Sequence, residues 1–481
     1  MQLATWLAQT PQFPEQVTTN SLLQNLVYAS GTVGALMILA GLLMVDTGGV
    51  RRVNVFAAAI EKLVGFWIGF VVYFLIGFAI WNWQYYVAFD IESPYWQSIK
   101  DWWLGGAFSN DVAQNVDPAS MGAGLNNQQI FIFFLAAFAG IVNVLIHLSV
   151  TERMKAAAYY VICVAAAVVS SLLSWLTWGS TGPLTNAGFH DFFGIGFVYL
   201  FPAGMALVLV RKVGSRPGMY DPHPAVPTYR SYNLGLTTAG VAVIFAGLPM
   251  VILSCLFFFE PEAYAVSVTM AETSVGVAFN NLGLAWAAGG LTGAAIAYWK
   301  RSYIYLLLGP LGAYVACAPA FDVYKPWQTF LVALGAPLVC FGVYEFSQGR
   351  RFDEHKLTPL FLGAGSYGLI MVGLISWGTA KGGHIFLDSG DYAFQNAEIN
   401  VLWQVIGLVV VVGTGIVTAW VLAFILERTI GLRLTEEEQV VGVDRGDWDL
   451  ESDLEPVSGN GLPTAPPEIT PATPPAVAPA D

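Results

Sequence analysis

Charged residues are scarce in this 481-residue chain. They make up 11% of it, against roughly 25% in an average soluble domain, and the mean hydropathy is +0.60. This shortage excludes a water-soluble globular protein and indicates a polytopic membrane protein that has the lipid bilayer as its partner. The net charge of −13 leaves no basic face for nucleic acid, because most of the excess acid follows Arg433.

Cysteine is also rare. The four cysteines lie inside apolar runs, without close pairing or the spacing of a metal site, and we interpret them as small core residues. No nucleophile–base pair or phosphate-binding loop falls on a predicted structured element. The sequence therefore predicts neither an enzyme nor a bound metal or cofactor.

Apolar runs of about 20 residues, enough for a helix to cross a bilayer core of about 30 Å, recur along the chain. Small residues are dense within them, which favours close packing where lipid supplies no hydrophobic drive for helices to associate. We predict an all-α polytopic membrane protein with eleven transmembrane helices in one bundle. The predicted spans are 25–45, 57–80, 129–150, 156–178, 191–211, 233–258, 277–299, 302–319, 328–347, 358–378 and 401–426.

The distribution of Lys and Arg predicts the orientation of these spans. One set of connections carries most of the basic residues, whereas the opposite set carries only Lys100, Lys325 and Lys381 amid many acidic residues. Because basic residues favour the cytoplasmic side, and an odd number of spans puts the termini on opposite sides, the N-terminus is expected outside and the C-terminus in the cytoplasm.

These boundaries divide the chain into four parts. Residues 1–24 are predicted to be an extracytoplasmic leader, 25–427 the transmembrane domain, 428–455 a cytoplasmic regulatory tail, and 456–481 a Pro-rich, disordered C-terminus. Within the transmembrane domain, the 84–126 loop is rich in Trp, Tyr, Asn and Gly, which suits either a cap over an entrance or simple packing.

Three short motifs follow one another on predicted cytoplasmic connections. They are "GGVRRVNV" at 48–55, "ERMK" at 152–155 and "GLRLTEEEQVVGVD" at 431–444. In this order they resemble the ammonium transporter family, which includes the Rhesus proteins, over about residues 25–445. The resemblance implies a fold of eleven helices, an outside N-terminus and a homotrimer with one pore per subunit. The low charge and the acidic tail fit a cell membrane such as a bacterial inner membrane.

The third motif lies in the predicted tail. In the family this tail folds beneath neighbouring subunits, couples them, and forms part of the surface used by trimeric PII-type signalling proteins. The alternative is a solvated acidic run. The residues that match the family's tail are Gly431, Leu432, Arg433, Glu436, Glu437, Glu438, Gly442 and Asp444.

The resemblance also implies the parts of a pore. In the family an aromatic cage recruits ammonium by cation–π attraction of about 0.5–2 kcal/mol. Deprotonation then avoids the cost of a charge inside the membrane, and two histidines share the proton. Trp178 matches the cage Trp, Asp191 the Asp that opens the fifth span, and Phe138 one of two gate Phe residues. Each of the three could equally be a packing residue.

The other pore positions depart from the family's pattern. Val251 stands at the second gate Phe and Cys255 at the cage Ser. Tyr199 stands at the first pore His, and Leu362 at the second, with Tyr367 as an alternative. A tyrosine hydroxyl, with a pKa of about 10 in water, relays protons poorly at neutral pH, and leucine cannot relay them.

Two functions remain open at this point. The first is a channel or transporter for ammonium, ammonia or another small solute such as carbon dioxide, with an altered pore. The second is a non-conducting family member that acts as a sensor or scaffold through its cytoplasmic tail.

Overall fold

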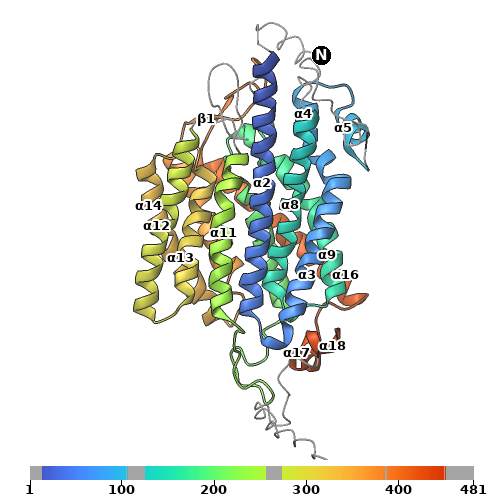
Figure 1. The fold of residues 1–481 in the computed structure, drawn as a ribbon, viewed down its shortest axis with the longest axis vertical. Helices are drawn as coiled ribbons and strands as arrows, with labels where there is room; N and C mark the ends of the chain where they lie inside the picture. The colour runs from blue at the N-terminus through green and yellow to red at the C-terminus, as the bar shows by residue number, and fades with distance from the viewer. Residues whose placement is uncertain are drawn as a thin grey trace, which may run out of the picture.

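The computed structural model describes residues 14–104, 106, 125–255, 274–384, 387–448 and 450. Most of the predicted leader, part of the 84–126 loop and the Pro-rich segment 456–481 lie outside these residues. The helices run along one long axis, and the short helices α17 (Glu436–Val441) and α18 (Val443–Gly446) lie at one end of the bundle (Figure 1). We call this the tail end and the opposite one the far end.

Long apolar helices make up most of the described chain, as the apolar runs predict. Nine helical segments of the described residues are long and apolar enough to cross a membrane. Helix α12 and the Ile304–Ala320 segment coincide with the two other predicted spans. The long helices are α2 (Pro14–Gly49), α3 (Val55–Val72), α4 (Phe78–Ala88), α8 (Leu125–Val150), α9 (Ala156–Thr177), α10 (Phe201–Val213), α11 (Leu234–Ser254), α12 (Val275–Lys300), α13 (Ile304–Cys317), α14 (Pro326–Gly349), α15 (Ser366–Ile375) and α16 (Val401–Arg428).

Short elements connect the long helices. Strands β1 (Ala380–Lys381) and β2 (Ala397–Glu398) pair antiparallel, with Ala380 opposite Glu398. The remaining pieces are α5 (Pro94–Trp102) and the tight turns η1 (Arg52–Asn54), η3 (Thr185–Ala187) and η5 (Ala318–Ala320).

Three of the long segments contain π-helical turns. These are η2 (Tyr73–Gly77) between α3 and α4, η4 (Gly196–Leu200) before α10, and η6 (Thr358–Gly365) before α15. A π turn adds one residue to a helical turn, reorients the side chains around it, and is frequent at functional sites. Segments η4 and η6 contact one another inside the bundle.

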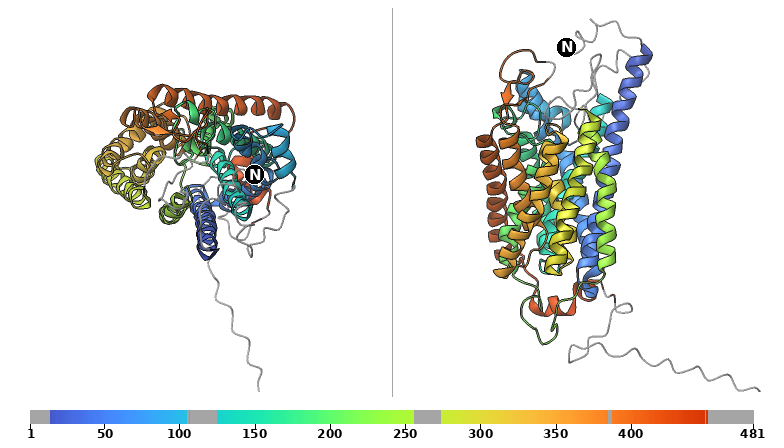
Figure 2. Two further views of the ribbon diagram at one scale, coloured as in Figure 1. Left: turned by 90° about the horizontal axis from the view of Figure 1, so that it is seen from above. Right: turned by 90° about the vertical axis from the view of Figure 1, so that its left-hand side faces the viewer.

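Helix α8 lies at the centre of the bundle and α16 at its edge. The apolar stretch of α8 is almost entirely buried against α2, α3, α9 and α10, whereas only 22% of the apolar stretch of α16 is buried. Helix α16 runs along one side of the bundle, against α10 and α15 (Figure 2). Such a wide exposed apolar surface suits a lipid environment.

Helices α2 and α11 lie side by side along most of their length (Figures 1 and 2). Glycines make this approach possible: a Cβ atom added to Gly34 would lie 2.6 Å from the carbonyl oxygen of Gly247, and one added to Gly41 would lie 2.6 Å from that of Gly240. The close contact depends on backbone meeting backbone.

We predict that Gly34→Ala lowers the unfolding midpoint, because the new methyl group must push α11 away, at a cost of about 1–3 kcal/mol. Gly283→Ala in α12 is the matched control, since nothing lies within 4 Å of its added Cβ. Thermal unfolding of the purified protein, followed by tryptophan fluorescence, measures both. Equal midpoints for the two variants would contradict this account of the helix contact.

Candidate functional site

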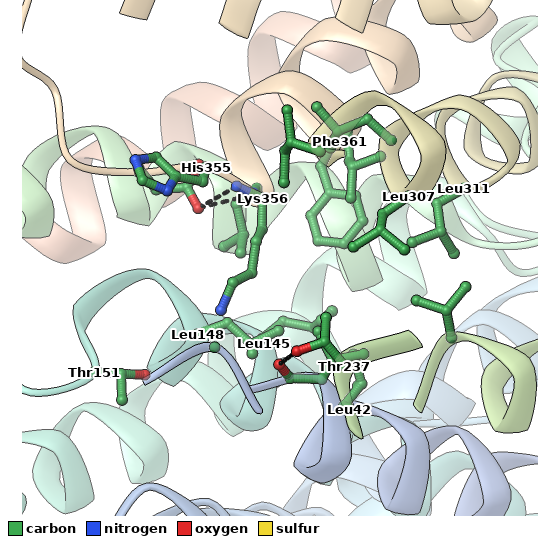
Figure 3. A pocket seen from close by; sticks show the side chains of 18 of the residues that line it. Leu42, Leu145, Leu148, Thr151, Thr237, Leu307, Leu311, His355, Lys356 and Phe361 are labelled. Atoms are coloured by element: carbon green, nitrogen blue, oxygen red, sulfur yellow. Dashed lines mark hydrogen bonds between the residues drawn. The ribbon is translucent and has the colours of Figure 1, made fainter. Parts of the chain in front are cut away.

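A cavity of about 330 Å³ lies inside the bundle between α2, α8, α11 and α13. Its walls are mainly aliphatic, with Leu42, Leu145, Leu148, Leu307 and Leu311 facing the same space (Figure 3). Residues of the loops 214–233 and 350–357 line it at the tail end. A solute that enters from the tail end therefore meets a charged rim first and an apolar interior after it.

Three aromatic rings line the cavity inside the bundle. The Tyr199 hydroxyl lies 3.0 Å from the Tyr314 hydroxyl, and the Tyr199 ring stacks on Phe361 with centroids 4.6 Å apart and an interplanar angle of 16°. All three side chains are buried. Tyr199 lies in η4, fourteen residues before the tail-end terminus of α10, which is a depth of about 20 Å at 1.5 Å per residue. We call these three residues the ring barrier.

The other two candidates in this region point elsewhere. Leu362 lines a second pocket, of about 500 Å³, together with Val210 and Val343. The Tyr367 hydroxyl donates to the carbonyl oxygen of Val332 at 3.5 Å and thus faces α14. The residue that η6 turns toward Tyr199 is Phe361, one position before Leu362.

Sequence reasoning missed Phe361 and Tyr314. Tyr314 lies within the apolar "LGAYVAC" stretch of α13, where a single hydroxyl in the middle of a span is the one available signal. A hydroxyl inside an apolar bundle needs a hydrogen-bonding partner, so Tyr314 and Tyr199 are natural candidates to find each other.

Trp178 and Asp191 lie on the far side of the ring barrier. The Trp178 indole N–H donates to the carbonyl oxygen of Phe192 at 3.2 Å, and its ring lies beside those of Trp81 and Phe197. The buried Asp191 carboxylate accepts from the backbone N–H groups of Ile195 and Gly196, at 3.0 and 2.8 Å. Asp191 therefore caps the turn that leads into η4 and orients the segment that carries Tyr199.

The remaining pore candidates are also buried. Phe138 in α8 meets Phe134 edge to face at 5.0 Å, and Val251 and Cys255 lie toward the far end of α11. Among the described residues that line the cavity, the one histidine is His355, at the tail end. His190 lies 3.0 Å from Asp322, away from the cavity lining.

The predicted tail residues lie against the tail end. The Leu432 carbonyl oxygen accepts from the backbone N–H of Lys155 at 3.0 Å, and Arg433 pairs with Met154 in a short β-bridge, so the tail begins on the "ERMK" turn. Gly431 and Gly442, with φ of +80° and +98°, occupy turns that favour glycine. Between them the Thr435 side chain caps α17, with Glu438 as its reciprocal partner.

Asp444 fixes the tail to the start of α3. Its carboxylate accepts from the backbone N–H groups of Phe56 and Ala57, at 3.0 and 2.7 Å, at the start of α3. The adjacent Val443 N–H donates to Asn54 at 2.8 Å. Glu436 lies 3.0 Å from His223, whereas Glu437 is exposed. The tail thus contacts both the "GGVRRVNV" and the "ERMK" turns.

A network of buried ion pairs joins these turns to the rim of the cavity. Glu152 accepts from the Arg51 backbone N–H at 3.1 Å and from the Tyr229 hydroxyl at 2.7 Å, and lies 3.3 Å from Arg216. Arg216 also pairs with Asp353 at 2.6 Å. Burial by itself would raise the pKa of Asp353, but Arg216 and Arg153 hold it well below its usual value.

A sequence profile described as the Ammonium Transporter Family matches residues 26–452. The chain belongs to the ammonium transporter family. Among its relatives, the ammonium transporter Amt2 of Archaeoglobus fulgidus is 24% identical, over 84% of this chain and 82% of its own length. The ammonium transporter Amt1 of Methanocaldococcus jannaschii is 23% identical, over 84% and 90%.

Solved structures share the fold of this family member. A protein described as a sensor Amt protein superimposes with a TM-score of 0.66 at 17% identity, over 89% of this chain and 99% of its own. Mep2 of Saccharomyces cerevisiae gives a TM-score of 0.61 at 16% identity, over 86% and 90%. The chain is therefore a multi-pass, all-α membrane protein of a transport family, and the resemblance predicted from the three motifs is confirmed.

His355 gives a pH-dependent prediction for this family member. Burial, together with nearby Arg216, lowers its pKa to about 3, whereas an unfolded chain gives histidine a pKa of about 6.5. Between these pH values the unfolded state binds a proton on His355 that the folded state does not bind. The free energy of unfolding therefore falls as the pH is lowered below about 6.5, by at most about 1.4 kcal/mol per pH unit.

Thermal unfolding at pH values from 7 down to about 4 measures this slope. We expect His355→Gln to flatten it, while other titrating groups act equally on both proteins. Identical slopes for the variant and the unmodified protein would contradict the prediction.

Proposed function

We propose that this chain is an ammonium transporter whose conduit is closed by the ring barrier, and that neutral ammonia, or another small neutral solute such as carbon dioxide, crosses the barrier. In this proposal all eleven predicted spans cross a cell membrane, with the N-terminus outside and the tail in the cytoplasm. Three copies form the homotrimer that the family resemblance implies, with one conduit in each. The observation that carries the proposal is the ring barrier at the inner end of the cavity.

The aromatic cluster at the far end supports recruitment of the cation. Trp178 lies among the rings of Trp81 and Phe197, and aromatic faces attract ammonium ions by about 0.5–2 kcal/mol. Phe138, Val251 and Cys255 are then expected along the approach to the barrier, as the resemblance implies.

The apolar cavity supports passage in the neutral form. A charge among the leucines of its walls would lose its hydration without gaining a partner, which is costly inside a membrane protein. The ring barrier offers two hydroxyls, which can donate to and accept from an ammonia molecule but do not take up protons near neutral pH. Ammonium therefore loses its proton on the far side of the ring barrier before ammonia crosses it.

Transport into proteoliposomes that contain a pH-sensitive dye tests this function. The protein should speed the internal pH change after an ammonium pulse relative to empty vesicles. Tyr199→Ala, which removes a ring from the barrier, should raise the rate about tenfold, equivalent to about 1.4 kcal/mol of barrier. Tyr367→Ala in α15, where the hydroxyl faces α14, is the matched control and should leave the rate unchanged. Rates equal to those of empty vesicles for ammonium, methylammonium and carbon dioxide would refute transport.

A second candidate is a sensor or scaffold that acts through the tail. It is favoured by the continuous ion-pair network from the cavity rim, through Asp353, Arg216 and Glu152, to the turns on which the tail lies. One solved structure with the same fold is described as a sensor Amt protein, which also supports this candidate. Its expected partner is a PII-type signalling protein at the cytoplasmic face.

Truncation after Arg433 tests this second candidate. The full chain, in detergent, should retain a purified PII-type protein on an affinity column, and the truncated chain should lose most of it. Asp444→Ala, which removes the carboxylate that holds α18 against α3, should give an intermediate loss. Equal retention by all three proteins would count against a role for the tail in binding.

A further inference from the structure

A single buried carboxylate binds two lysines at the tail end of the bundle. Asp46, near the end of α2, pairs with Lys62 of α3 through one oxygen and with Lys356 of the 350–357 loop through the other. The Thr151 hydroxyl donates to the same oxygen as Lys62, at 2.8 Å. The Asp46 side chain is only 1% exposed, so these contacts replace its hydration.

Lys62 is fixed in this arrangement. Its side chain is fully buried, and its ammonium group also donates to the Ala58 carbonyl oxygen at 2.9 Å and to His147 Nδ1 at 2.7 Å. Since a lysine ammonium can only donate, His147 is assigned as the neutral ring with its proton on Nε2, directed at Glu61 at 2.6 Å. Asp46, Lys62 and His147 are thus each held by several buried partners.

Lys356 is held differently. It belongs to a loop, and its side chain is 28% exposed. The side chain reaches across the cavity toward Leu148 and Thr151 (Figure 3). Both Lys356 and Thr151 line the cavity. A solute inside the cavity can therefore reach the Asp46 oxygen that Lys356 occupies as soon as this side chain withdraws.

The charges around Asp46 balance only while Lys356 is in place. Without it, the buried cluster contains two carboxylates, Asp46 and Glu61, against the single ammonium of Lys62. A buried cluster with one negative charge in excess is destabilised, so the cluster attracts another small cation with N–H donors. Lys356 carries a primary ammonium group, the same hydrogen-bonding head as that of a free ammonium or methylammonium ion.

We infer that the Asp46 carboxylate oxygen paired with Lys356 is a binding site for a small ammonium ion, which the ε-ammonium group of Lys356 occupies in this structure and from which a free ion can displace it. The site lies beside the cavity, on the tail side of the ring barrier. It is separate from the aromatic cluster at the far end.

Displacement of Lys356 would affect both the barrier and the rim. Its neighbour Glu354 accepts from the backbone N–H groups of Leu357 and Thr358, at 2.9 and 2.6 Å, and so caps η6, the segment that carries Phe361. Asp353 in the same loop pairs with Arg216. A free ion at Asp46 would thus loosen the loop that orients the ring barrier; this consequence rests on the proposed function, whereas the binding itself does not.

Thermal unfolding of the full chain in detergent tests the binding, because there the ion reaches the cavity without crossing the conduit. Lys356→Met leaves Asp46 without its second cation. We expect ammonium chloride to raise the unfolding midpoint of this variant by about 3 °C more than equal choline chloride, and to saturate. Lys356→Arg retains a tethered cation and is the matched control. Ammonium that binds elsewhere stabilises all of these proteins equally, so it cancels in the comparison. An ammonium response in Lys356→Met no larger than in Lys356→Arg and the unmodified protein would overturn the inference.

The unmodified protein provides a second test if Lys356→Met does not fold. Amine-selective labelling, read by mass spectrometry, reports how accessible each lysine is. Ammonium should raise the labelling of Lys356 relative to that of Lys212, a surface lysine whose labelling corrects for consumed reagent. A constant ratio across ammonium concentrations would overturn the inference. Because neither test involves transport, failure here and failure of the liposome assay are distinguishable.

Discussion

Charges that leave water must find partners, and the tail end of this bundle depends on that requirement. Glu152 and Asp353 are buried, and Arg216 lies between them and pairs with both, while Arg51 and Arg153 add a second cation to each carboxylate. Arg216 belongs to the loop after α10 and Asp353 to the loop after α14, so the pairing fixes two loops that are distant in sequence. The tail contacts the turns held by this pairing, and its position follows from the same network.

The ring barrier depends on a different constraint, the local geometry of two π-helical segments. Regular helices through η4 and η6 would turn successive side chains by about 100° per residue, and a π turn changes that rotation locally. Tyr199 and Phe361 consequently stack, while Leu362 faces a separate pocket. Asp191 at the start of η4 and Glu354 at the start of η6 cap the two segments. Each of these two rings is thus carried by a segment whose start is held by a carboxylate, from Asp191 outside the cavity lining and from Glu354 at the cavity rim.

The 350–357 loop links these two regions. It contributes Asp353 to the ion pairs of the rim, Glu354 to the cap of η6, and Lys356 to the Asp46 cluster. Transport and sensing would both act through this loop, since a change in its position alters the barrier on one side and the turns beneath the tail on the other. The two proposed functions are therefore alternative outputs of one arrangement.

The sequence by itself determined the helical spans, the membrane environment and the family, because these depend on apolar length, on the scarcity of charge and on short turn motifs that are local in the chain. It also directed attention to Tyr199, eight residues beyond Asp191. Only the tertiary structure decided which side chains meet: Tyr314 and Phe361 at the barrier, and Lys62 and Lys356 on Asp46. In helices that are apolar on all faces, no periodic pattern marks the inward side, and a shift of one residue, as from Leu362 to Phe361, turns the side chain toward a different neighbour.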